Sequence, residues 1–241
     1  VQGMGGIMSL TGHPGSPPTR VGTSVGDITA GLFTTIGINA ALFERSRTGL
    51  GRKIDVAMLD CQIAILENAI ARYFSTGQIP GPLGARHPSI TPFEAFKTRD
   101  GWMIIAAGND GLFRKLADAL ARPDLVDNAL FTNNDLRTKH AAALKAEIEQ
   151  ALATRDTAEW LTLIDLAGVP CGPINNVAQA LADPQIRARN MIVAVDDPDV
   201  GELRMAGNPI KISDAADPAT RRPAPALDAD RQRILREFGL G

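Results

Sequence analysis

The sequence predicts an α/β protein in which a smaller α+β body, over about residues 90–190, lies between two outer segments. Three observations predict this class. Apolar residues recur at helical spacing after Asp27, two short β-prone runs flank Asp100 and Gly101, and strands alternate with helices too irregularly for a barrel. The 241 residues, of which 44% are hydrophobic, are enough to bury a sizeable core.

Charge and composition exclude several kinds of partner. The 25 basic and 27 acidic residues give a net charge of −2, which argues against a nucleic-acid surface and gives no reason to expect an anionic membrane as partner. No apolar run approaches the roughly 18 residues that span a bilayer. Two distant cysteines and three scattered histidines show neither disulfide nor metal-ligand spacing, so we expect no metal site and a reducing, cytoplasmic location.

The first outer segment contains a loop and a long helix. Residues 1–25 are rich in glycine and proline and predict the loop. Asp27 then stands at the start of an amphipathic helix, where it would act as the N-cap, and Gly49 ends that helix. The small residues Gly31 and Gly37 indicate that another backbone packs closely against the helix.

The remaining elements follow from hydrophobic spacing, capping residues and turn residues. The helices expected from this pattern lie at about 57–75, 109–121, 135–153, 156–167, 176–182 and 228–238, the last capped by Asp228. The strands expected lie at 53–56, 93–97, 102–107, 192–195 and 202–205. Asp100-Gly101 predicts a hairpin, and proline marks a loop over 218–225. The long glycine- and proline-rich loop over 77–92 indicates a domain boundary in or near it.

Few residues stand out as candidates for chemistry, and each has a structural alternative. Asp27 is the most interesting acid, and a capping role is compatible with catalysis because a helix N-terminus also keeps a carboxylate ionised. His87 is either an active-site acid, base or ligand-binding group, or a solvated loop histidine. We interpret Asp60 as a buried, hydrogen-bonded structural acid, the two cysteines as core residues, and the charged stretch 137–149 as a solvated helix face.

Several stretches of the sequence stand in an order and at separations that are found together in one family. They are Met8–Leu32, which contains Gly26-Asp27-Ile28-Thr29-Ala30-Gly31-Leu32, then Arg47–Val56, His87–Gly101 and Gly168–Asn176. These stretches resemble the class III CoA-transferases, the family of formyl-CoA transferase and the CaiB/BaiF proteins. The resemblance extends over nearly all 241 residues without large gaps.

The resemblance implies the class III CoA-transferase fold, which has a Rossmann-like large domain, a smaller α+β domain and an interlocked homodimer. Members of the family are longer than this chain, so the large domain is expected to be incomplete here and to lack an N-terminal Rossmann-like region. On that pattern, residues 1–55 belong to the large domain, 56–89 form a helix and linker, and 90–190 form the small domain. Residues 191–241 would form a linker and the C-terminal return to the large domain.

The resemblance also implies a chemistry, because the catalytic aspartate of the family falls on Asp27. This carboxylate would attack an acyl-CoA thioester and pass CoA to a carboxylic acid through anhydride and aspartyl-CoA intermediates. The other site residues expected are Arg20 for the CoA phosphates and Gly84, His87, Gly108 and Asn109 for the substrate and its oxyanions. Coenzyme A is then a substrate, and no permanently bound cofactor is expected.

Two other functions stay open. Racemases of α-methylacyl-CoA esters share the fold and use the aspartate for proton transfer, but they show a glycine-rich run after it, whereas Ile28-Thr29-Ala30 follows here and resembles the transferase branch. A catalytically inactive chain that only forms a dimer or a structural body is the third possibility. The stretches 89–96 and 170–176 resemble family members that act on dicarboxylyl-CoA donors such as succinyl-CoA.

Overall fold

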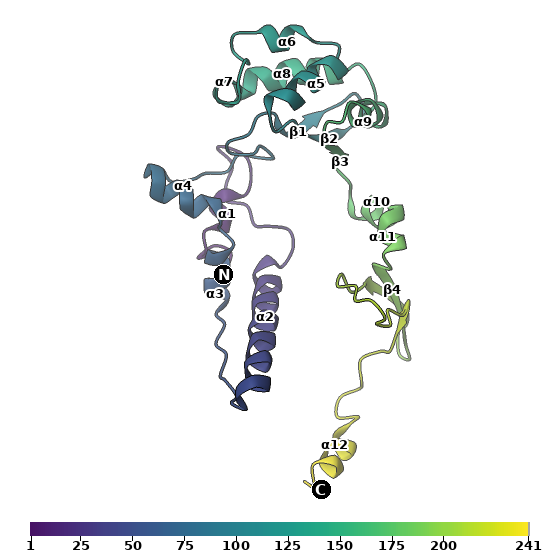
Figure 1. Cartoon of the computed structure of the whole chain (residues 1–241). Coiled ribbons are helices and arrows are strands. Elements are labelled where there is room, and N and C mark those ends of the chain that lie inside the picture. The colour runs from purple at the N-terminus through teal and green to yellow at the C-terminus, as the bar shows by residue number, and fades with distance from the viewer. Residues whose placement is uncertain (241) are drawn as a thin grey trace. The chain divides into compact units, whose positions relative to one another are not determined.

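The computed structural model describes residues 1–240, and these form two compact units of mixed helices and strands (Figure 1). The first unit is Val1–Pro173, and the second begins at Ile174. The division into segments at residues 55, 89 and 190 that the sequence suggested remains a prediction.

Helix α2 (Val25–Thr48) is the longest element of the first unit. The sequence predicted Asp27 as the N-cap of this helix, but Asp27 is the third residue of the helix. The helix starts earlier because the N–H of Ile28 already donates to the carbonyl oxygen of Ser24, at 3.0 Å, which makes Ser24 the N-cap. The end of α2 is as predicted: Gly49 adopts φ +73° and its N–H donates to the carbonyl oxygen of Arg45 at 2.8 Å.

The segment after Gly49 differs from the prediction. Residues 53–56 pair with no strand in the part of the chain that the structure describes, so they form an extended segment rather than a strand. This segment packs on α2 through a side chain, since a Cβ at Gly37 would lie 3.1 Å from Cγ2 of Ile54. The close backbone approach expected at Gly31 and Gly37 is not found in the described chain, because nothing lies within 4 Å of a Cβ at Gly31 and the neighbour of Gly37 is a side-chain atom. The helix expected over 57–75 is interrupted at Glu67, which adopts φ +50°. The short helices here are α1 (Ile7–Leu10), α3 (Met58–Ala64) and α4 (Asn68–Thr76).

A three-stranded antiparallel sheet organises the part of the first unit from residue 93 to residue 173. Its strands are β1 (Phe93–Lys97), β2 (Trp102–Ala106) and β3 (Cys171–Pro173), in the order β1-β2-β3. The hairpin predicted at Asp100-Gly101 joins β1 and β2, with Phe96 paired to Met103. The third strand was not predicted, because three residues are too few to show an alternating pattern.

Helices α5, α8 and α9 cover the sheet and bury the main core. The helices of this part are α5 (Asp110–Ala119), α6 (Asp124–Asp127), α7 (Asn134–Lys139), α8 (Ala141–Leu152) and α9 (Thr157–Leu166). The helix expected over 135–153 is broken at His140, which lies outside helical geometry. The capping box of α9, formed by Asp156 and Glu159, is as predicted. Trp160 is buried, and its indole N–H donates to the carbonyl oxygen of Leu152 at 2.8 Å.

The second unit contains a small sheet and short helices. Its elements are α10 (Val177–Ala182), α11 (Pro184–Ala188), β4 (Ile192–Asp197), β5 (Gly201–Ala206), β6 (Thr220–Arg221) and α12 (Arg231–Glu237). The sheet has the order β5-β4-β6, with β6 parallel to β4, although the sequence predicted only a proline-rich loop there. Asp228 does not cap the last helix, because it adopts φ +65° and Asp230 is the N-cap.

The β1–β2 hairpin is fastened to helix α9 through Asp100. Its Oδ1 accepts from the backbone N–H of Thr157 at 2.8 Å and from the hydroxyl of the same residue at 2.7 Å. These two hydrogen bonds lower the pKa of Asp100 below its ordinary value, and the bond from the backbone N–H has the larger effect. A carboxylate whose pKa is lowered by folding stabilises the folded state above its ordinary pKa, and that contribution is lost as the pH falls through the lowered value.

We therefore expect Asp100→Asn to lower the melting temperature at neutral pH, with a difference from wild type that shrinks as the pH falls through the pKa of Asp100. Thermal unfolding followed by circular dichroism across acidic and neutral pH measures this. Asp118→Asn is the matched control, because the side chain of Asp118 makes no hydrogen bond within residues 1–240. An equal loss for Asp100→Asn at every pH would contradict the argument.

Candidate active site

Asp27 is an exposed carboxylate in the first turn of α2. It lies beside the free N–H groups of that turn, at the positive end of the helix dipole. Its side chain makes no hydrogen bond with any residue that the structure describes. Gly26 beside it is buried, and a Cβ there would lie 2.6 Å from Cγ1 of Val1. The backbone is thus tightly packed at this turn while the Asp27 carboxylate stays accessible to a reactant.

A buried amide, which was not predicted from the sequence, supports the same turn. Gln62 of α3 is fully buried and its Nε2 lies 3.5 Å from Oγ1 of Thr29, while its Oε1 is buried without a hydrogen-bond partner. A Cβ at Gly5 would lie 2.5 Å from Cβ of Gln62. The only sequence signal was a polar residue on an apolar helix. Asp60 of the same helix is exposed, so its interpretation as a buried structural acid was wrong.

The loop that contains Gly84 is tied to the first loop of the chain. The N–H of Gly84 donates to the carbonyl oxygen of Gly12 at 2.8 Å. Gly84 adopts φ +65°, and a Cβ there would lie 2.9 Å from Nδ1 of His13. Glycine is needed at this position both for the backbone conformation and for the contact with the His13 ring.

His87 is held in place by contacts of its ring and its backbone. It is therefore not the solvated loop histidine that was one of the two alternatives for this residue. Its ring is half-buried and stacks on Phe93, with the ring centroids 5.4 Å apart and the planes at 7°. The backbone N–H of His87 donates to the carbonyl oxygen of Phe93 at 2.9 Å. Nδ1 of the ring accepts from the backbone N–H of Ser89 at 3.2 Å. Nε2 is therefore the ring nitrogen that remains for a ligand.

Gly108 and Asn109 form the exposed turn between β2 and α5. Oδ1 of Asn109 accepts from the N–H of Leu112 at 2.9 Å, so this side chain caps α5. The backbone N–H groups of Gly108 and Asn109 make no hydrogen bond within the described chain. The carbonyl oxygen of Pro92 accepts from the N–H of Ala107 at 2.9 Å, which brings this turn to the start of β1.

The structure thus brings His87 and the Gly108-Asn109 turn to one end of the β1–β2 hairpin, where Phe93 pairs with Ala106. Asp27 and Arg20, which is exposed, share no hydrogen bond or ion pair with this group among the described residues. Within the same part of the chain, no group of three or more histidine, cysteine or acidic residues is arranged to hold a metal ion.

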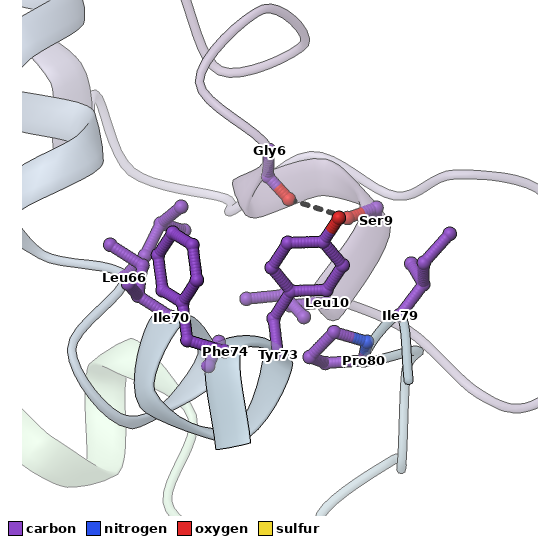
Figure 2. Close-up of a pocket in the computed structure, with 10 residues that line it drawn as sticks. Gly6, Ser9, Leu10, Leu66, Ile70, Tyr73, Phe74, Ile79 and Pro80 are labelled. Atoms are coloured by element: carbon purple, nitrogen blue, oxygen red, sulfur yellow. Dashed lines mark hydrogen bonds between the residues drawn. The ribbon is translucent and has the colours of Figure 1, made fainter. Parts of the chain in front are cut away.

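An apolar hollow of about 320 Å³ lies beside α4 and contains none of the residues expected at the site (Figure 2). Its residues are Gly6, Ser9, Leu10, Leu66, Ala69, Ile70, Tyr73, Phe74, Ile79 and Pro80. The hydroxyl of Ser9 donates to the carbonyl oxygen of Gly6 at 2.7 Å, and the Tyr73 ring extends toward Ser9 (Figure 2). The hollow offers an apolar surface and few groups that could do chemistry.

The sequence as a whole matches one family. The model of CoA-transferase family III matches residues 1–231. The chain belongs to CoA-transferase family III. Its relatives include the acetyl-CoA:oxalate CoA-transferase of Acetobacter aceti, 44% identical over 239 residues, which are 99% of this chain and 60% of that protein. The succinate–glutarate CoA-transferase of Agrobacterium fabrum is 37% identical over 243 residues, covering 99% of this chain and 59% of that protein.

A solved structure confirms the fold class. The crystal structure of a CaiB/BaiF family protein from Brucella suis superposes with a TM-score of 0.80 at 39% identity, over 98% of this chain and 61% of that one. The predicted α/β fold of the class III CoA-transferases is therefore confirmed. The chain spans about 60% of the length of the relatives it matches.

Helix α2 presents an exposed apolar face. The large apolar side chains along it that are at least a third exposed are Ile28, Leu32, Phe33, Ile36, Ile38, Leu42 and Phe43. By length and composition alone, α2 would also suffice to cross a membrane, which is weak evidence when a single helix passes that test. This helix contains no long uninterrupted apolar run, so only its mean hydropathy reveals it.

The ring of His13 lies too close to Gly84 for a side chain at that position. Gly84→Ala is expected to destabilise the first unit by about 1–2 kcal/mol for the left-handed backbone, and by a further amount because its Cβ would meet the His13 ring. Gly77→Ala is the matched control, because Gly77 has φ +70° and nothing within 4 Å of its Cβ position. Urea unfolding measures both variants. Equal losses for the two would show that the His13 contact contributes nothing.

Proposed function

We propose that the complete protein transfers CoA from an acyl-CoA thioester to a carboxylic acid, with Asp27 as the nucleophile. The observation that carries this proposal is the exposed, unpaired carboxylate in the first turn of α2, in a chain that belongs to CoA-transferase family III. The names of the relatives support CoA transfer as the type of reaction. A carboxylate nucleophile needs no general base, because its attacking oxygen has no proton to lose.

All four steps of the proposed reaction involve the Asp27 carboxylate. An oxygen of Asp27 attacks the thioester carbonyl of the donor, which forms a mixed anhydride and releases the CoA thiolate. The thiolate attacks the aspartyl carbonyl, which gives an aspartyl-CoA thioester and the free donor acid. The acceptor carboxylate attacks this thioester, which forms a second anhydride and releases the CoA thiolate. The thiolate then attacks the acyl carbonyl of the anhydride, which gives the new acyl-CoA and the free Asp27 carboxylate.

Each step passes through an oxyanion that requires hydrogen-bond donors. The free backbone N–H groups of Gly108 and Asn109 are the donors we assign to it, with the loop at Gly84 as a further element of the pocket. The Nε2 position of His87 is assigned to the substrate, since Nδ1 of this ring is already occupied. Arg20, which is exposed ahead of α2, is assigned to the phosphates of CoA.

The acceptor we propose is a small dicarboxylic acid. Relatives of this chain are named for oxalate, for succinate and glutarate, and for mesaconate. These acids share two carboxylates, of which one would react and the other would bind. Coenzyme A is a substrate in this scheme, and no bound cofactor takes part in it.

Asp27→Asn in the complete protein is expected to lower CoA transfer by several orders of magnitude, because the steps of a covalent mechanism act as a unit. The fold is expected to survive, since the Asp27 side chain makes no hydrogen bond in the described chain. Steady-state transfer from succinyl-CoA to oxalate, glutarate or mesaconate measures the loss. Hydroxylamine should trap an acyl group on the wild-type protein only.

Asp60→Asn is the matched control, because Asp60 is an exposed carboxylate on the neighbouring helix α3. It is expected to keep normal turnover. Near-normal turnover of Asp27→Asn, with deamidation excluded by mass spectrometry, would overturn the assignment. Exchange of the α-proton of an acyl-CoA for deuterium in the absence of any acceptor acid would instead support the racemase alternative.

We also propose that the complete protein is a cytoplasmic homodimer, and the exposed apolar face of α2 supports an interface. The interface is expected to be of the obligate kind, on the order of 2,000 Å² or more. Light scattering at micromolar concentration measures the mass. A monodisperse monomer of the complete protein would contradict the dimer.

A further inference from the structure

Arg137 of α7 is a buried charge in a stretch that the sequence indicated was a solvated helix face. Its exposed fraction is 1%. Its Nε donates to the carbonyl oxygen of Thr91 at 2.8 Å, its Nη1 to the carbonyl oxygen of Phe131 at 3.0 Å, and its Nη2 to Oδ1 of Asp110 at 2.6 Å. The guanidinium also lies over the ring of Phe113, 4.5 Å from its centroid. Every nitrogen of the guanidinium is therefore used.

Two of the three acceptors of Arg137 lie on the two segments of the candidate site. Thr91 precedes Pro92, whose carbonyl oxygen accepts from Ala107, and it follows the loop of His87. Asp110 directly follows the Gly108-Asn109 turn. One guanidinium thus links the segment that holds His87 to the turn that carries the free N–H groups.

The rest of α7 fastens the same segment. Oδ1 of Asn134 accepts from the N–H of Thr91 at 3.1 Å, and its Nδ2 donates to the carbonyl oxygen of Ser89 at 2.8 Å. The hydroxyls of Thr91 and Thr138 lie 3.1 Å apart. Three residues on one short helix therefore hold 89–91, and Arg137 is the one that also reaches the turn before α5.

The ion pair has an electrostatic consequence for the turn. The carboxylate of Asp110 is half-exposed and belongs to the residue next to Asn109. Unpaired, its negative charge would oppose an oxyanion at the N–H groups of Gly108 and Asn109. The buried guanidinium offsets that charge from the protein side and leaves the solvent side of the turn free.

We infer that Arg137 is a positioning residue for CoA transfer: it fixes the Gly108-Asn109 turn against the His87 segment and offsets the charge of Asp110. This inference rests on the proposed function. Arginine is required because its planar fork serves three acceptors in different directions, whereas the single ammonium of lysine cannot reach all of them. Arg137 touches no reactant and acts only through the turn.

The test compares Arg137→Lys with Arg122→Lys in the complete protein. Arg122 is a matched control, since its Nη2 pairs with Asp124 at 2.7 Å and Glu147 at 2.8 Å, and it binds neither site segment. We expect Arg137→Lys to lower kcat by about 10²-fold, as small misplacements of catalytic groups do, with the KM for acyl-CoA little changed. Arg122→Lys should keep the kcat of wild type. Each kcat is calculated per folded molecule, and the folded fraction of each variant is taken from its cooperative thermal unfolding.

A second pair of variants tests the electrostatic part. Arg137→Gln leaves the Asp110 carboxylate unpaired, and adding Asp110→Asn should restore about tenfold of the lost kcat if charge is the cause. A wild-type kcat for Arg137→Lys, or losses in both lysine variants that only follow their melting temperatures, would overturn the inference. No recovery in a folded double variant would overturn its electrostatic part. A wild-type protein without transfer activity would refute the proposed function instead.

Discussion

Burial of one face of the β1-β2-β3 sheet is the constraint on which the fold of residues 93–173 depends. Phe96 and Met103 pair across the hairpin and are fully buried, as is Ile105. A sheet of three short strands is not stable alone, so α5, α8 and α9 must cover this face. Glu94, on the same face, is accommodated because Nζ of Lys145 lies 2.6 Å from its carboxylate. The ends of the strands are fixed as a consequence of this packing.

The candidate site uses those fixed ends. The turn after β2 and the loop before β1 are irregular segments, but both begin or end on buried strands and both are fastened to α7. This is the usual relation between a rigid scaffold and the loops that carry chemistry. Asp27 is positioned by different means, because its turn depends on close packing around Gly26 and on the buried amide of Gln62.

The features that the sequence predicted correctly depend on neighbours in the chain. Gly49 ends α2 because glycine tolerates the left-handed conformation, and Asp156 caps α9 through a residue three positions away. The features that it missed depend on distant partners. Strand β3 exists only because β2 lies beside it, and Arg137 is buried because acceptors at positions 91, 110 and 131 surround it. Ser24 and Asp27 are equally good caps locally, so sequence alone could not place the start of α2.

The exposed apolar face of α2 couples the folding of this region to its association. Each square ångström of that face removed from water stabilises the covered state by about 25 cal/mol. Folding and covering are then parts of one equilibrium, so the apparent stability of this region rises with the concentration of whatever surface covers it. During synthesis, a chain that exposes α2 before this surface is available would be a substrate for chaperones and prone to aggregate.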